Sequence, residues 1–370
     1  MSTARGLEGV VAAESSISSI IDGVLTYRGI NIDDLATNAS FEEVIYLLWN
    51  GDLPTQSQLD QLTKDLANNA ALPEELIRQM RLFPKDVHPM TAVRTAFSAL
   101  AMYDPETESQ DPEANRRKAV RIQAKIATIV TTFARLREGK EPVQPRSDLS
   151  FAANFLYMLT GEEPSSVSED AFNKALVLHA DHELNASTFA SRVTVATLSD
   201  IYSGITSAIG TLKGPLHGGA NEQVMAMLEE IGDVSKAEEY IMNKLNNKEK
   251  IMGFGHRVYK NGDPRAKHLK EMSKQLTALT GEPKWYELSV KINEIVTREK
   301  GLLPNVDFYS ASVYHSLGIP RDLFTPIFVV SRTSGWIAHI LEQYANNRLI
   351  RPRAEYVGPQ MRAYVPINER

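Results

Sequence analysis

The chain has 370 residues, of which 43% are hydrophobic and 23% are charged, and this composition excludes a mainly disordered, collagen-like or coiled-coil protein. It holds 40 basic residues against 46 acidic ones, so its net charge is −6, which argues against a general nucleic-acid or membrane-surface binder. Cysteine is absent, which excludes disulfides, thiolate zinc sites and cysteine nucleophiles.

The first elements in chain order form a short β-hairpin. Residues 16–21 and 24–27 are rich in β-forming side chains and flank Asp22-Gly23, a dipeptide typical of tight hairpin turns. No strand–helix–strand alternation follows, which disfavours doubly wound and barrel α/β folds.

Helical patterns occupy almost all of the remaining chain. Ser40-Phe-Glu-Glu43 is a capping box that predicts a helix over 41–50, ended by Gly51. Apolar spacing predicts further helices over 59–70, 73–82, 90–103, 112–138, 151–160, 168–182, 188–210, 219–231, 235–247, 264–280, 284–299, 306–317 and 323–347. The expected fold is mainly α, with helices packed in more than one layer.

Neither a secretory signal nor a membrane span is expected. Residues 1–11 lack a basic stretch followed by an apolar one. The most apolar segment, 327–340, is interrupted by Ser331, Arg332 and Ser334, so no run is long enough to cross a bilayer. The sequence therefore predicts a cytoplasmic protein.

Two histidines lie in loops rich in glycine and proline. His217 precedes Gly218-Gly219, which allow a ligand to approach closely, and a following helix dipole would hold its imidazole neutral as a hydrogen-bond donor. His256 follows Gly253-Phe-Gly255 and stands nine positions before Arg265, whose guanidinium can bind a carboxylate through two hydrogen bonds. A turn or capping histidine at 217 remains an alternative.

Charged residues in apolar or loop surroundings complete the candidate set. Asp307 stands between Val306 and Phe308, where burial would raise its pKa and suit it as a general base, although an N-cap aspartate would look the same. Arg332 is the one charge in a long apolar helix and needs an acidic or anionic partner. Arg351 follows that helix as surface charge or as an anion clamp.

Other motifs have simpler explanations. Gly253-Phe-Gly255 lacks the third glycine of a dinucleotide fingerprint, because position 258 is valine, and no βαβ unit surrounds it. His179 and His182 lie three residues apart on a predicted helix face, which suits packing or ligand contact better than metal binding. Asp263-Pro-Arg265 could also be a plain helix start with Asp263 as N-cap. The basic residues of 116–121 are most simply a solvated helix face, with a CoA-phosphate contact as the alternative.

Together these segments resemble the citrate synthase family, and most closely its shorter Gram-positive bacterial branch. The matching segments occur in the family's order and spacing: 5–10, 178–185, 214–221, 253–260, 263–265, 305–307 and 350–352. The resemblance extends over essentially the whole chain and implies a metal-free condensation of acetyl-CoA with oxaloacetate, followed by hydrolysis of citryl-CoA to citrate and CoA.

The resemblance also implies roles for single residues. Asp307 would remove a methyl proton of acetyl-CoA, His217 would hydrogen-bond the thioester oxygen, and His256 would polarise the oxaloacetate carbonyl. Further oxaloacetate contacts are implied for His182, Arg265, Arg332 and Arg351. CoA contacts are implied for Lys250, Ile251, Gly253, Phe254 and Gly255.

The implied architecture has two helical domains and two subunits. A large domain of residues 1–218 and 319–370 would flank a small domain of residues 219–318, with the active site in the cleft between them. Arg351 would enter the partner's site in a homodimer. NADH control is not expected, because the chain starts directly at the hairpin.

Two other functions stay open on the sequence. A 2-methylcitrate synthase shares nearly all of these motifs, and a hydrophobic pocket discriminates one methyl group by only about 1–3 kcal/mol. A non-catalytic helical binding protein on the same scaffold would have to lack a catalytic group, whereas His217, His256 and Asp307 are all present.

Overall fold

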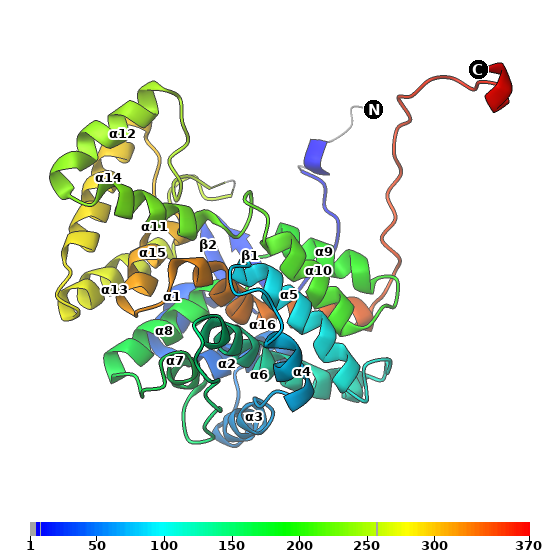
Figure 1. Cartoon of the computed structure of the whole chain (residues 1–370), viewed down its shortest axis with the longest axis horizontal. Helices are drawn as coiled ribbons and strands as arrows, with labels where there is room; N and C mark the ends of the chain where they lie inside the picture. The colour runs from blue at the N-terminus through cyan, green and yellow to red at the C-terminus, as the bar shows by residue number, and fades with distance from the viewer. Residues whose placement is uncertain (1–4, 8, 257) are drawn as a thin grey trace.

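The computed structural model describes residues 5–7, 9–256 and 258–370. Glu8 and Arg257, which belong to two of the matching segments, lie outside the described residues. The fold is mainly α with a small N-terminal sheet, so the predicted fold class is confirmed (Figure 1).

The predicted hairpin forms, and its first strand begins at Ser18, two residues later than expected. β1 (Ser18–Ile21) pairs antiparallel with β2 (Val24–Tyr27) across Asp22 and Gly23. Both turn residues have positive φ, 52° and 81°, which is the geometry that Asp-Gly favours in two-residue hairpins. A third strand, β3 (Ile30–Asn31), was not predicted and pairs with β2.

Ten helices are described before residue 213. They are α1 (Ile32–Asn38), α2 (Phe41–Asn50), α3 (Gln56–Asn68), α4 (Glu74–Met80), α5 (Pro89–Leu100), α6 (Pro112–Arg137), α7 (Phe151–Thr160), α8 (Ser166–His179), α9 (Ala186–Val195) and α10 (Ile201–Leu212). The capping box at Ser40 is confirmed, since Ser40 Oγ accepts from Glu43 N and the Glu43 carboxylate accepts from Ser40 N.

The described helices of the second half are α11 (Ala220–Ile231), α12 (Ala237–Asn246), α13 (Ala266–Leu279), α14 (Lys284–Lys300), α15 (Val306–Ser316) and α16 (Phe324–Ala345). Short 3₁₀ turns lie at Arg5–Leu7, Ala101–Tyr103, Val234–Lys236, Arg321–Leu323 and Ile367–Glu369. In Figure 1, α11 to α15 form a group on one side of the molecule, and the segment after α16 extends away from the body.

Two predicted helices were wrong in extent. The helix expected over 168–182 ends at His179, and beyond it Glu183 takes a left-handed conformation with φ 52°. The helix expected over 188–210 is two helices, because Asp200 caps a new helix by accepting a hydrogen bond from Ser203 N at 2.9 Å. The first difference moves His182 off the helix and into a turn.

Helix α16 is the centre of the core. Every residue from Phe324 to Ile340 is buried, and the helix packs against α2, α6, α8, α9 and α10. This burial explains the long apolar sequence of the helix. It also means that Arg332, which is only 2% exposed, must be stabilised inside the protein.

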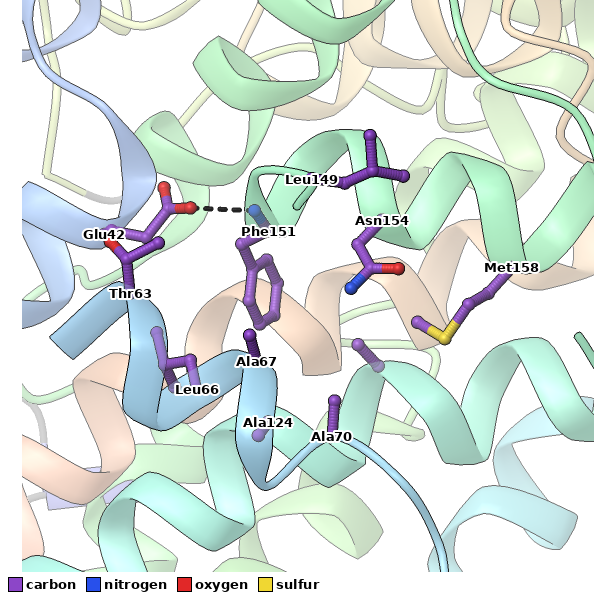
Figure 2. A pocket seen from close by; sticks show the side chains of 11 residues that line it. Glu42, Thr63, Leu66, Ala67, Ala70, Ala124, Leu149, Phe151, Asn154 and Met158 are labelled. Atoms are coloured by element: carbon purple, nitrogen blue, oxygen red, sulfur yellow. Dashed lines mark hydrogen bonds between the residues drawn. The ribbon is translucent and has the colours of Figure 1, made fainter. Parts of the chain in front are cut away.

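A small cavity of about 20 Å³ lies between α2, α3, α6 and α7 (Figure 2). Its most polar wall is Glu42, whose carboxylate accepts a hydrogen bond from Phe151 N at 2.7 Å. Burial raises the pKa of Glu42. None of the residues predicted to act on a substrate lines this cavity, so it belongs to the packing of the helices.

Candidate functional site

The loop that carries His256 is joined by main-chain hydrogen bonds to the loop before α15, the helix that carries Asp307. Gly255 N donates to Leu303 O, and Asn305 N donates to Gly253 O, both at 2.9 Å. The Asn305 side chain adds a bond to Gly255 O at 3.0 Å and also caps α15 by accepting from Asp307 N at 3.0 Å. These bonds hold the His256 loop beside the first turn of α15, so residues about 50 positions apart become neighbours.

Asp307 has the environment of a general base. Its Oδ1 atom is buried and has no hydrogen-bond partner among the described residues. Burial raises the pKa of Asp307 to about 7, against the lowering effect of Arg265 and Arg332. A carboxyl group that loses its proton near neutral pH can accept a proton from a weak carbon acid.

His217 lies in the loop before α11 and is held through Ser187. Ser187 N donates to His217 Nε2 at 3.3 Å, and Ser187 Oγ lies 2.8 Å from the same atom. Because Nε2 accepts a main-chain hydrogen bond, a neutral ring carries its proton on Nδ1. Nδ1 has no partner among the described residues, so its N–H can donate to a bound molecule.

The charge state of His217 follows from its surroundings. Burial lowers the pKa of His217 to about 4, and the Arg332 guanidinium acts in the same direction. The sequence attributed the neutral state to the helix dipole, but α11 begins three residues later, and burial is the main cause. His217 is thus a neutral hydrogen-bond donor at pH 7.

Two histidines face each other across the site. The rings of His182 and His256 lie 5.2 Å apart in an edge-to-face arrangement, and His182 Nε2 lies 2.9 Å from Tyr259 Oη. Burial lowers the pKa of both histidines, and the Arg265 guanidinium adds to the effect. Both rings are therefore neutral at pH 7 and can donate hydrogen bonds to a carbonyl or carboxylate.

The two buried arginines are held in different ways. Arg332 Nε donates to His179 O at 2.8 Å, and its guanidinium lies 4.7 Å from the centre of the Phe328 ring. Burial lowers the pKa of Arg332 to about 10, so it keeps its charge at pH 7. Arg265 instead forms a two-point ion pair with Asp263 at 2.8 and 2.9 Å.

Asp263 does more than begin a helix. The predicted N-cap position was wrong, because α13 starts at Ala266 with Arg265 as its N-cap. Asp263 is buried, binds Arg265, and accepts from Val306 N at 3.1 Å at the start of α15. It therefore connects an arginine of the site to the helix that carries Asp307.

The remaining predicted site residues are placed as follows. Arg351 is exposed and follows α16 without belonging to a helix or strand. In the loop predicted to bind CoA, Lys250 is exposed, whereas Ile251, Gly253 and Phe254 are buried. The Gly253 carbonyl and the Gly255 N–H are already used in bonds to residues 303–305.

The alternative motifs lose support. His179 ends α8 and His182 lies in the following turn, so the two do not share a helix face. Across the described ranges, no group of three or more His, Cys, Asp or Glu side chains could hold a metal ion. Within residues 116–121, Lys118 is fully buried and donates to Thr107 O and Ser109 O. The prediction that this helix face is fully solvated was therefore wrong.

Two neighbours of the candidate residues, and a third residue that bonds to one of these neighbours, were missed on the sequence. Ser187 contacts His217, Tyr259 contacts His182, and Trp336 Nε1 donates to Ser187 Oγ at 3.1 Å. Asn185, which caps α9 by accepting from Thr188 N, is a sequence signal that could have drawn attention to Ser187. Trp336 carried no such signal, because it stands in a continuous apolar helix.

Among the described helices, none is long and apolar enough to cross a membrane.

Comparison with known proteins agrees with this geometry. Residues 6–353 match the family described as citrate synthase, C-terminal domain. The chain is 67% identical to citrate synthase 2 of Bacillus subtilis (strain 168) over 100% of both chains. It is 45% identical to the citrate/2-methylcitrate synthase of the same organism over 96% of each chain.

A solved structure has the same fold throughout. The ternary complex of carboxymethyl coenzyme A and oxaloacetate with citrate synthase from Thermoplasma acidophilum has a TM-score of 0.94 and 37% sequence identity, and the match covers 99% of each chain. At this identity and coverage the likeness extends beyond the general arrangement of helices. The chain belongs to the citrate synthase family.

Proposed function

We propose that the protein condenses acetyl-CoA with oxaloacetate and hydrolyses the resulting citryl-CoA to citrate and CoA, the first step of the tricarboxylic acid cycle. The observation that carries this proposal is the pairing of a base and a donor with suitable charge states. Asp307 has a pKa of about 7, and His217 is a neutral ring with a free Nδ1–H. A methyl group beside a thioester is a weak acid, so its deprotonation needs both groups at once.

The roles of the other residues follow from the chemistry of oxaloacetate. His256 polarises the ketone and donates a proton as the new carbon–carbon bond forms. Arg332, Arg265 and His182 bind the carboxylates, which suits two buried cations and a neutral imidazole. We assign no metal or other cofactor, because proton transfer and hydrogen bonding suffice for this reaction, and we place the enzyme in the cytoplasm.

Closure between two domains would protect the intermediates from water. We propose that residues 219–318 form a small domain over a large domain of residues 1–218 and 319–370. In support, α11 and α13 pack against α15, and α12 packs against α14, so these helices have a core of their own. Lys250, Ile251, Gly253, Phe254 and Gly255 remain the proposed CoA contacts.

The test of the reaction is a two-substrate comparison. We expect kcat/KM for acetyl-CoA to exceed that for propionyl-CoA by at least about tenfold, with oxaloacetate saturating, since one methylene changes binding by about 1–3 kcal/mol. CoA release is followed with a thiol reagent, which the enzyme itself does not consume because it has no cysteine. A preference for propionyl-CoA would favour 2-methylcitrate synthase, the activity that the name of the 45% identical relative includes.

We further propose a homodimer in which Arg351 completes the partner's site. In support, Arg351 is exposed, and the chain after α16 extends away from the body of the molecule (Figure 1). A heterodimer of one Arg351→Ala chain and one Asp307→Asn chain would hold one intact site, so it should regain about half of the wild-type turnover. Two affinity tags isolate this heterodimer, and both homodimers serve as controls. If Arg351 acted within its own chain, the heterodimer would be as inactive as the homodimers.

A further inference from the structure

His182 lies in a turn that is not stable by itself. Helix α8 ends at His179, and Glu183, the residue after His182, has φ 52°. A non-glycine residue in this left-handed region costs about 1–3 kcal/mol and persists only where the surroundings hold it. The contacts around the turn therefore decide where the His182 ring points.

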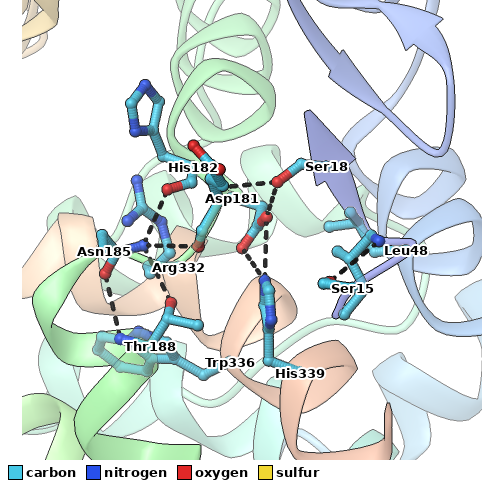
Figure 3. Close-up of polar contacts among 12 residues, drawn as sticks. Ser15, Ser18, Leu48, Asp181, His182, Asn185, Thr188, Arg332, Trp336 and His339 are labelled. Carbon is cyan, nitrogen blue, oxygen red and sulfur yellow. Dashed lines mark hydrogen bonds and ion pairs between the residues drawn. The ribbon is translucent and has the colours of Figure 1, made fainter. Parts of the chain in front are cut away.

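Ser18 of the N-terminal sheet spans this turn. Its hydroxyl donates to Asp181 Oδ2 at 2.5 Å and accepts from Glu183 N at 2.8 Å (Figure 3). The two partners are the residues immediately before and after His182. A single side chain, 163 positions away from Asp181, thus fixes both ends of the segment that carries the histidine.

His339 of α16 holds the same carboxylate from the other side. Its Nε2 atom lies 3.2 Å from Asp181 Oδ2, and Arg192 Nε and Nη2 lie 3.1 and 3.0 Å from its Nδ1 atom (Figure 3 shows the contact with Asp181). Arginine can only donate, so Nδ1 accepts and Nε2 carries the hydrogen. His339 therefore donates to Asp181, which is fully buried and requires such partners.

The same face of α16 carries Arg332. Positions 332, 335 and 339 follow one another at helical spacing, so their side chains lie on one face. At Gly335 a side chain would collide with Ala180 O and would lie 2.5 Å from Asp181 Oδ1, so glycine allows the helix to approach the turn. Arg332 Nε donates to His179 O at 2.8 Å from this face. The turn and the arginine are thus held by one helix.

We propose that Ser18, Asp181 and His339 are positioning residues of the oxaloacetate subsite, which hold His182 in place beside Arg332. This inference rests on the proposed function and adds to it three residues that touch no substrate. It predicts that loosening the turn weakens oxaloacetate binding, while the base Asp307 and the donor His217, which are held by other contacts, keep their places.

The test compares two adjacent serines of β1. Ser18→Ala removes both hydrogen bonds to the turn. We expect KM for oxaloacetate to rise about tenfold, an effect typical of losing hydrogen bonds to a charged group. We expect kcat to stay within about twofold of wild type. Ser19→Ala is the matched control, because Ser19 is equally half-buried but its hydroxyl bonds, among the described residues, only to Thr26 Oγ1, at 2.8 Å. Ser18→Thr keeps the hydroxyl and should restore KM.

Three outcomes are informative. Equal KM values for Ser18→Ala and Ser19→Ala would overturn the inference. A lower Tm for Ser18→Ala, with kcat and both KM values impaired together, would assign Ser18 a structural role only and would also overturn it. If the wild-type protein did not turn over acetyl-CoA, the proposed function would fail separately, and calorimetric titration with oxaloacetate would still compare the serine variants.

Discussion

Replacing Asp307 by asparagine is expected to lower kcat by about 10³-fold while oxaloacetate still binds, since a positioned general base contributes about 10² to 10⁴ in rate. Asparagine keeps the size of the side chain but cannot accept a proton. The loss should fall on kcat because Asp307 contacts neither His182 nor Arg332 in the described hydrogen bonds. Initial rates with saturating acetyl-CoA, together with calorimetric titration of oxaloacetate, measure the two effects separately.

The pH profile of the wild-type enzyme checks the same assignment. A base must be deprotonated to act, so kcat/KM for acetyl-CoA should rise as the pH passes upward through about 7, the pKa of Asp307, and then level off. His217, with a pKa of about 4, stays neutral over this range. Asp233→Asn, which changes an exposed carboxylate, is the control. Substantial turnover in Asp307→Asn, or a profile that falls through pH 7, would refute the base assignment.

Replacing His217 by alanine is expected to lower kcat by about 10²- to 10³-fold, the usual effect of losing one donor to a developing oxyanion. The physical reason is the free Nδ1–H, which follows from the occupied Nε2 atom. Oxaloacetate affinity should change little, because His217 shares no hydrogen bond with His182 or Arg332. Steady-state rates with each substrate varied in turn measure both quantities.

The tautomer of His217 makes a second variant informative. Asparagine can place its amide N–H near the position of Nδ1–H, so His217→Asn should recover part of the rate that His217→Ala loses. His315→Ala is the control, because His315 lies in the last turn of α15, the opposite end from Asp307. A His217→Ala enzyme within tenfold of wild type would contradict the donor role.

Local signals predicted much of the fold. Capping residues lie next to the chain that they cap, so the capping box at Ser40 placed α2. Helix α6 begins at Pro112, as expected, and the structure shows Asp111 as its N-cap. Helix ends without such signals were missed. No residue type between His179 and Glu183 signals the end of a helix. The turn there is instead held by residues from elsewhere in the chain, namely Ser18, Tyr27 and His339.

The properties of the candidate site also divide into those that local sequence predicts and those that distant contacts set. The sequence by itself determined which groups are available: imidazoles, a carboxylate among apolar neighbours, guanidinium groups, and glycine-rich loops that allow a ligand to approach. These properties depend on residue types within a few positions of one another. Motifs in the family's order then identified the chemistry.

Only the tertiary structure decided the partners and the charge states. Arg265 is paired with Asp263, His217 is held by Ser187, and Asp181 meets His339 across 158 positions of sequence. Burial, which raises the pKa of Asp307 and lowers that of His217, depends on how whole helices pack. Hydrogen bonds and desolvation act through space, so side chains far apart in the sequence set the reactivity of residues that the motifs only identify.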